Sequence, residues 1–312
     1  MRQFCLDNPF FYFEMNKNLL YSSILIFISL TWAGSFIAVR LYSQVVSPLY
    51  LGFFRFVVAT PVMIAIVLLR KKAFFLPRKE LPSLIILGLT GVTLIYIFQF
   101  YGVAYTTAST ASSLINTNVL FIAVFSALFL HEDFPKNKRI GVLLSLIGVF
   151  FVVYGQINSE NIVVDSLFLI GCSFILISAL CWALYTIVGK RLLEKYDYLQ
   201  ITANVFLIGT LCYLPFVLPN VTSGIQSLDI PSLIAILYLG LLCSVFGYVA
   251  WYYVLSKQQA AKSAVFLTLI PLFTITLSFF IGEIPTIAFF FGAVMVMVGV
   301  YITQRKNKEY EM

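Results

Sequence analysis

Arg55 has the strongest chemical demands of any side chain in this sequence, because it lies inside a long apolar segment, 48–69. It comes about seven residues into that segment, or about 10 Å along a helix that rises 1.5 Å per residue. A guanidinium at that depth in a bilayer costs at least about 2.5 kcal/mol. No acidic residue lies at a comparable depth in the other apolar segments. Arg55 is therefore expected either to reach the headgroups or cap a neighbouring helix, or to bind an anionic group of a solute in a cavity.

Two other apolar segments carry aromatic and polar residues spaced i, i+3 and i+4, which places each set on one helical face. The sets are Tyr96, Gln99 and Phe100 in 83–103, and Tyr248, Trp251 and Tyr252 in 233–255. Polar side chains in hydrocarbon need partners, so both faces should turn inward. They either join helices through a few hydrogen bonds or form two aromatic walls of a cavity.

Further amphipathic side chains lie in the remaining apolar segments. Trp32 and Trp182 fit either a cavity or an aromatic belt at the membrane surface. Together these features predict a set of substrate-binding residues: Trp32, Arg55, Tyr96, Gln99, Asn116, Trp182, Tyr185, Asn204, Tyr248 and Trp251.

The sequence provides no recognisable metal, cofactor or catalytic centre. His131 is the only histidine and stands beside Glu132 and Asp133, where an interfacial position is a simpler interpretation than a proton relay. Four of the five cysteines lie in apolar segments without C-x-x-C spacing, as small hydrophobic residues do. Lys190 follows Gly189, but the first glycine and the Ser/Thr of a phosphate-binding loop are missing. The chain is not expected to be an enzyme or to need a cofactor; a membrane enzyme or a channel is the alternative.

The composition indicates an integral membrane protein. The 312 residues are 61% hydrophobic and 11% charged, with a mean hydropathy of +0.98, whereas soluble domains carry about 25% charged residues. Apolar runs close to about 20 residues suit membrane-spanning helices rather than the alternating strands of a barrel. The prediction is an all-α polytopic protein with ten helices, at 19–39, 48–69, 83–103, 108–130, 139–155, 168–188, 198–218, 233–255, 261–282 and 285–303.

Matching residues recur 150 to 152 positions apart. They include Trp32 and Trp182, Arg40 and Lys190, Tyr96 and Tyr248, Glu132 and Glu283, Gly141 and Gly292, and Gly148 and Gly299. The chain thus divides into an N-terminal segment 1–18, a five-helix repeat 19–155, an external linker 156–167, a second repeat 168–305 and a tail 306–312. An odd number of spans in each repeat predicts opposite orientations in the bilayer, as in many transporters.

The basic residues predict the orientation of the chain. All of the 20 lysines and arginines except Arg40 and Arg55 fall on one side of the predicted bilayer. The positive-inside rule places that side, and both termini, in the cytoplasm of a cell-membrane protein. The net charge of +7 then reflects orientation and lipid contact, not binding of nucleic acid. The expected partners are membrane lipids and a small-molecule substrate, with the protein a monomer or weak homodimer.

Several short motifs resemble a known family over residues 20 to 305. They are Thr31-Trp32-Ala33-Gly34-Ser35 with Arg40, Arg55 ahead of Pro61, Ala108-Ser109-Thr110-Ala111-Ser112-Ser113, Phe129-Leu130-His131-Glu132, Ile281-Gly282-Glu283 and Pro271. In this order they are similar to EamA-type members of the drug/metabolite transporter superfamily. The resemblance implies a central cavity within helices one to four and six to nine, with the fifth and tenth outside. The chain departs from the pattern at Val119-Leu120, where a proline equivalent to Pro271 is missing.

That family moves amino acids, sugars, nucleotide sugars and other metabolites, so the resemblance does not select a substrate. The prediction is a secondary active or facilitative carrier, an exporter of small organic metabolites such as amino acids, working by alternating access.

Overall fold

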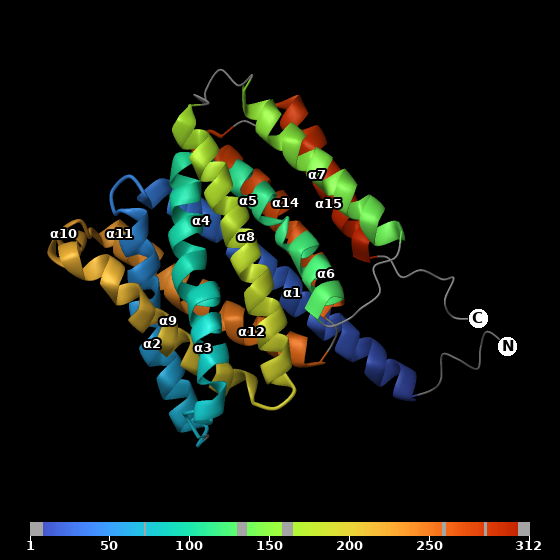
Figure 1. Cartoon of the computed structure of the whole chain (residues 1–312). Helices are drawn as coiled ribbons and strands as arrows, with labels where there is room; N and C mark the ends of the chain where they lie inside the picture. Colours follow the sequence, from blue (N-terminus) through green and yellow to red (C-terminus); the bar gives the residue numbers. More distant parts are fainter. Residues whose placement is uncertain are drawn as a thin grey trace.

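The computed structural model describes residues 9–71, 73–129, 136–157, 165–257, 260–283 and 286–304, and the described residues form helices without any strand (Figure 1). The first half contains α1 (Pro9–Tyr42), α2 (Pro48–Leu69), η1 (Arg78–Glu80), α3 (Leu81–Gly88), η2 (Leu89–Thr93), α4 (Leu94–Tyr105), α5 (Ala108–Ile115), α6 (Asn118–Phe129) and α7 (Lys136–Ile157). The second half contains α8 (Ser166–Leu193), α9 (Tyr198–Val217), η3 (Leu218–Asn220), α10 (Val221–Gln226), α11 (Ile230–Leu237), η4 (Tyr238–Phe246), α12 (Gly247–Lys257), α13 (Ala260–Ala264), η5 (Val265–Thr268), α14 (Leu269–Ser278), η6 (Phe279–Ile281) and α15 (Ile287–Gln304).

Seven continuous helical stretches in the described chain are long and apolar enough to cross a membrane. They are Leu19–Tyr42, Pro48–Leu69, Arg78–Tyr105, Ala108–Phe129, Ser166–Leu193, Tyr198–Gln226 and Ile230–Lys257. Three shorter apolar helices, Arg139–Val152, Phe266–Ile281 and Ile287–Gly299, coincide with the remaining predicted segments. Large apolar side chains cover much of the outer surface; Leu69, Phe280 and Ile287 are each more than 80% exposed. Such a surface is suited to contact with lipid.

The third and eighth predicted segments are not regular α-helices throughout. Each contains a π-helical stretch, η2 and η4, at corresponding places in the two halves. A π-turn holds one extra residue and redirects the side chains that follow it. A hydroxyl of each stretch donates to a carbonyl: Thr93 donates to the Gly209 carbonyl of the neighbouring helix α9 at 2.8 Å, and Ser244 donates to the Leu239 carbonyl within η4 at 3.0 Å.

The fourth predicted segment breaks between α5 and α6 although it has no proline. Asn116 and Thr117 form a turn there, and the Thr117 hydroxyl donates to the Leu114 carbonyl at 2.8 Å. Local hydrogen bonds of this kind compete with the helical pattern. The ninth segment is also interrupted, by the 3-10 stretch η5 just before Pro271 in the first turn of α14.

Helices α7 and α15 form a separate antiparallel pair at one side of the bundle (Figure 1). Glycines let their backbones touch, because a Cβ on Gly148 would lie 2.8 Å from the Gly292 carbonyl oxygen and one on Gly299 would lie 2.6 Å from that of Gly141. Gly141 near the start of α7 meets Gly299 near the end of α15, and Gly148 further along α7 meets Gly292 earlier in α15. The two helices therefore run in opposite directions. Small residues favour close contacts of this kind in membranes.

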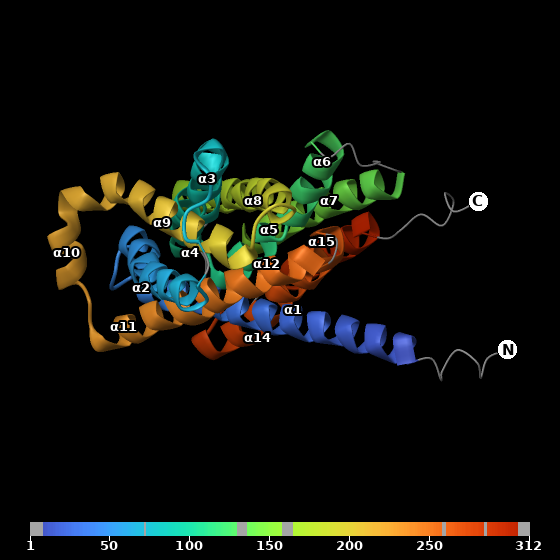
Figure 2. The ribbon, with the colours of Figure 1, turned by 90° about the horizontal axis from the view of Figure 1, so that it is seen from below.

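In Figure 2, α5 and α12 lie near the middle of the bundle, and α10 and α7 lie at opposite sides of the molecule. Helix α2 packs against α9, and α4 against α8. The Thr60 and Thr210 hydroxyls, 150 positions apart in the sequence, are hydrogen-bonded at 2.9 Å between α2 and α9.

Loops that carry basic residues gather at one end of the bundle. The Asn204 amide donates to the Phe74 carbonyl at 2.6 Å, and the Tyr196 hydroxyl donates to the Glu80 carboxylate at 3.2 Å. Arg191 donates to the Phe129 carbonyl at 2.6 Å, which brings the end of α6 to the same place.

Helix α1 begins at Pro9, so part of the predicted N-terminal segment 1–18 is helical. His131 and Glu132, most of the predicted linker 156–167 and the tail 306–312 lie outside the described residues.

Gly292→Ala is expected to lower the free energy of unfolding by about 1–3 kcal/mol, because the added methyl group would meet the backbone of α7. The Cβ would lie 2.7 Å from the Gly148 carbonyl oxygen. Thermal unfolding in detergent measures the effect, with Val294→Ala on the exposed face of α15 as the control. Equal midpoints for the two variants would contradict the packing argument.

Candidate functional site

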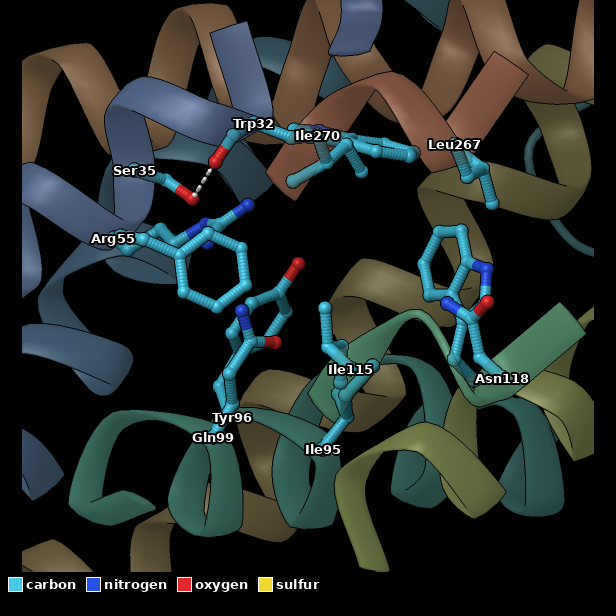
Figure 3. Close-up of a pocket in the computed structure, with 12 residues that line it drawn as sticks. Trp32, Ser35, Arg55, Ile95, Tyr96, Gln99, Ile115, Asn118, Leu267 and Ile270 are labelled. Atoms are coloured by element: carbon cyan, nitrogen blue, oxygen red, sulfur yellow. Dashed lines mark hydrogen bonds between the residues drawn. The ribbon is translucent and has the colours of Figure 1, made fainter. Parts of the chain in front are cut away.

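A cavity lies inside the bundle, lined by residues of α1, α2, α4, α5, α6, α8, η5 and α14 (Figure 3). Five of the predicted binding residues line it: Trp32, Arg55, Tyr96, Gln99 and Trp182. The predicted set of binding residues did not include the other seven, which are Ser35, Phe36, Ile95, Ile115, Asn118, Leu267 and Ile270. The cavity has a volume of about 40 Å³, which is enough for a few water molecules.

Arg55 is 1% exposed, so its guanidinium does not reach the headgroups. Its Nε donates to the Ser244 hydroxyl at 2.5 Å. The guanidinium carbon lies 4.0 Å from the centre of the Tyr96 ring, a favourable cation–π distance. Arg55 forms no ion pair with any residue of the described chain. The sequence analysis did not predict Ser244 as a partner of Arg55. The one signal for it in the sequence is a hydroxyl residue within an apolar segment.

All three tryptophans of the chain form one cluster beside the cavity. The ring centres lie 5.2 Å apart for Trp32 and Trp182, 5.9 Å for Trp182 and Trp251, and 6.1 Å for Trp32 and Trp251. Trp32 and Trp182 are both buried, so neither lies in an interfacial belt. The Trp32 indole donates to the Cys243 carbonyl at 2.9 Å, within η4.

The two predicted aromatic faces turn inward and meet. The Tyr96 and Tyr248 hydroxyls are 2.8 Å apart, and Tyr248 donates to the Gly91 carbonyl at 2.6 Å. Tyr96 and Gln99 line the cavity, whereas Tyr248 and Trp251 lie outside its lining. The face of α4 therefore lines the cavity, and the face of α12 packs behind that lining.

Three more predicted residues lie outside the cavity lining. Tyr185 is fully buried, and its ring stacks on that of Tyr252 with centres 5.0 Å apart. Asn204 is remote, since its amide joins the α2–α3 loop through the Phe74 carbonyl. Asn116 is buried at the break between α5 and α6, whereas Asn118, at the start of α6, lines the cavity.

Several buried polar atoms have no hydrogen-bond partner within the described residues. Two belong to residues that line the cavity: the indole Nε1 of Trp182, a donor, and the amide Oδ1 of Asn118, an acceptor. Buried polar groups in proteins are almost always paired, so unpaired ones beside a cavity mark places for water or a ligand.

A charged cluster lies beyond the cavity, at the N-terminus of α5. The Glu283 carboxylate accepts from the backbone N–H of Ala108 at 3.1 Å and of Ser109 at 3.2 Å. Its Oε1 lies 3.3 Å from Arg40 Nε, and Arg40 also donates to the Ala104 carbonyl at 3.2 Å. A carboxylate is favourable at a helix N-terminus. In the sequence Glu283 stood out only as the counterpart of Glu132 and as part of a motif, but in the structure its contacts join three parts of the bundle.

A related contact lies at the other end. Lys190, the counterpart of Arg40 at an offset of 150, donates to the Leu255 carbonyl at 2.6 Å. Leu255 follows Ala104 by 151 positions, so the two basic residues bind equivalent carbonyls.

Comparison with known proteins agrees with this architecture. The model of the EamA-like transporter family matches the chain twice, at residues 20–154 and 169–305. An uncharacterized transporter of Archaeoglobus fulgidus is 36% identical over 281 residues, which cover 90% of this chain and 96% of that protein. A probable terminal-alkyne amino-acid exporter of Streptantibioticus cattleyicolor is 25% identical over 283 residues, or 89% of this chain and 91% of that protein.

A protein of known crystal structure has a similar fold, with a TM-score of 0.64, 16% sequence identity, and coverage of 91% of this chain and 94% of that one. The helices are apolar enough to cross a membrane, and the family model accounts for both halves of the sequence. The chain therefore belongs to the EamA-like transporter family of multi-pass membrane proteins.

Proposed function

We propose that the protein is a secondary active or facilitative carrier that exports a small organic metabolite across the cell membrane by alternating access around the central cavity. The observation that carries the proposal is the cavity itself, with a buried cation and unpaired polar atoms inside a bundle contributed by both halves of the chain. Amino acids or related compounds are the first substrate candidates, and the similarity to a probable amino-acid exporter supports them.

In this proposal ten helices span the membrane, the seven long stretches and the three shorter ones, as two inverted repeats. The antiparallel pairing of α7 with α15 supports inversion, because their glycines correspond at an offset of 151. The contact between Thr60 and Thr210 also supports it, since equivalent residues meet where a two-fold axis passes.

The proposed orientation has the basic loops in the cytoplasm. Arg70, Lys71, Arg78 and Lys79 flank the α2–α3 connection, which contacts the α8–α9 loop that carries Lys195. The positive-inside rule then places Arg40 and Glu283 on the external side.

Transport requires the cavity to enlarge. Its present space of about 40 Å³ is far below the roughly 300–1,000 Å³ of sites that hold small ligands. Arg40 and Glu283 close the proposed external end, and the contact of Lys190 with Leu255 belongs to the cytoplasmic end. Loss of one set of contacts while the other persists would open the cavity to one side at a time, which is the requirement for alternating access.

A carrier, a channel and a membrane enzyme differ in a liposome assay. Vesicles containing the protein and loaded with an unlabelled amino acid or an N-acylated amino acid are expected to accumulate the labelled form of at least one of these solutes by counterflow, with a rate that saturates. Ser35→Phe should reduce that rate at least about tenfold because the added ring fills the cavity space. Thr276→Phe, on the exposed face of α14, serves as the control. A flux that rises linearly without counterflow would indicate a channel, and chemical conversion of the solute would indicate an enzyme.

The external contact can be tested by accessibility of the cavity. In a Ser35→Cys variant that has no other cysteines, Glu283→Gln is expected to increase labelling of the introduced thiol by an impermeant maleimide added outside. Weakening the ion pair and the α5 contacts by about 1 kcal/mol would shift the open population about fivefold. Glu80→Gln, at the opposite end, provides the control. Equal labelling of the two variants would argue against closure by this cluster.

A further inference from the structure

The cavity carries charge of one sign only. Among the described residues that line it, Arg55 is the sole charged side chain, and no carboxylate is present. The remaining lining is aromatic, aliphatic, amide or hydroxyl in character. Arg55 is 1% exposed, so its positive charge acts at short range on whatever occupies this space.

The protein uses only part of the hydrogen-bonding capacity of Arg55. Its Nε donates to Ser244, and Tyr96 covers one face of the guanidinium. A guanidinium has five N–H donors, and besides the Ser244 hydroxyl its described contacts are with aromatic residues, the Tyr96 hydroxyl included. Figure 3 shows the side chain extending toward the cavity beside Ser35 and Tyr96. A planar carboxylate matches the unused fork of donors.

The opposite end of the cavity is polar but uncharged. Asn118 lies across the cavity from Arg55 (Figure 3). Its Oδ1 and the Trp182 indole N–H both lack a partner in the described part of the chain. One acceptor and one donor together suit an amide or a hydroxyl group. Between the two ends, Ile115, Leu267 and Ile270 provide apolar surface.

We propose that the transported solute is a monocarboxylate that carries no cationic group. Its carboxylate binds Arg55, its apolar body contacts the isoleucine and leucine side chains, and a neutral hydrogen-bonding group meets Asn118 and Trp182. The inference rests on the proposed carrier function and narrows its substrate class. N-acylated amino acids and hydroxy acids fit this arrangement. The ammonium group of a free amino acid would find no carboxylate among the described lining residues, and burying an unpaired charge is unfavourable.

Four leucine derivatives separate charge from shape. N-acetyl-leucine is an anion, leucine a zwitterion, leucinamide a cation and N-acetyl-leucinamide neutral, while all share one side chain. Intrinsic tryptophan fluorescence provides the readout, because all three tryptophans cluster at the cavity. N-acetyl-leucine is expected to bind at least about tenfold more tightly than each of the other three compounds. One charge-assisted hydrogen bond is strong enough to produce a difference in affinity of this size.

Arg55→Gln should weaken binding of N-acetyl-leucine about 10- to 100-fold and bring it to the level of N-acetyl-leucinamide. Arg55→Lys keeps the charge without the planar fork and should fall between. Arg70→Gln, at the exposed end of α2, is the matched control and should bind like the unaltered protein. If Arg55→Gln fails to fold, the affinities of the unaltered protein for the four compounds still test whether the solute is a monocarboxylate without a cationic group.

Equal or tighter binding of leucine, leucinamide or the neutral compound would overturn the inference, and so would a fluorescence unchanged by all four. Counterflow of labelled leucine and N-acetyl-leucine distinguishes this failure from failure of the carrier function. Exchange of leucine in preference to N-acetyl-leucine would refute the monocarboxylate and keep the carrier. Absence of exchange for any labelled solute, amino acids included, would refute the carrier.

Discussion

A guanidinium buried among apolar helices is the constraint on which the centre of this structure depends. Arg55 is 1% exposed and forms no ion pair with a described residue, so its charge is stabilised by a hydroxyl and by aromatic rings. The hydroxyl is that of Ser244, within the π-helical stretch η4. The nearest ring is that of Tyr96. The Tyr96 hydroxyl is hydrogen-bonded to that of Tyr248, which donates to the Gly91 carbonyl in the matching stretch η2. Both irregular stretches therefore support the same charge, in keeping with the frequent occurrence of π-turns at functional sites.

The frame around this centre is built by close backbone contact. Glycines of α7 and α15 place the two helices against each other, and Gly88 lies against the backbone of Gly209 in α9, where a Cβ would be 2.9 Å from its nitrogen. Gly240 makes the related contact with the Arg55 carbonyl in α2. Lipid provides little hydrophobic drive for helices to associate, so packing of small residues and hydrogen bonds between helices provide the stability. The same contacts hold the cavity-lining helices at defined distances.

The ends of the bundle differ from its centre in how charge is handled. At one end Glu283 meets Arg40 and two backbone N–H groups, all short-range contacts that can be exchanged for water when the helices separate. In the centre, Arg55 contacts a hydroxyl and aromatic rings, and under the proposed function part of its donor capacity serves the solute. A carrier needs this combination, because contacts at the ends must open while the binding group stays in place.

Periodicity and composition determined much of the fold. Apolar runs and the recurrence of residues at about 150 positions predicted the helical segments, and the short motifs carried the resemblance to the family, which the matches of both halves confirm. Helix boundaries were close where a proline marks a helix start, as at Pro48, the first residue of α2. The breaks were not foreseen in detail, because a π-turn or the turn at Asn116 depends on side-chain hydrogen bonds to nearby carbonyls and not on hydropathy.

For the candidate site too, the sequence predicted some residues, and the tertiary structure determined the others. Arg55, Tyr96, Gln99, Trp32 and Trp182 were found from the sequence because a charge, an amide or a large amphipathic ring in an apolar segment must turn inward. The sequence did not reveal which inward-facing residues touch the cavity. Tyr248 and Trp251 lie behind it, Asn204 bonds to a distant loop, and Asn118 takes the place expected for Asn116. Helical spacing determines the face of each helix on its own, whereas membership of one cavity depends on how far each helix is rotated and bent against its neighbours, and only the tertiary packing decides that.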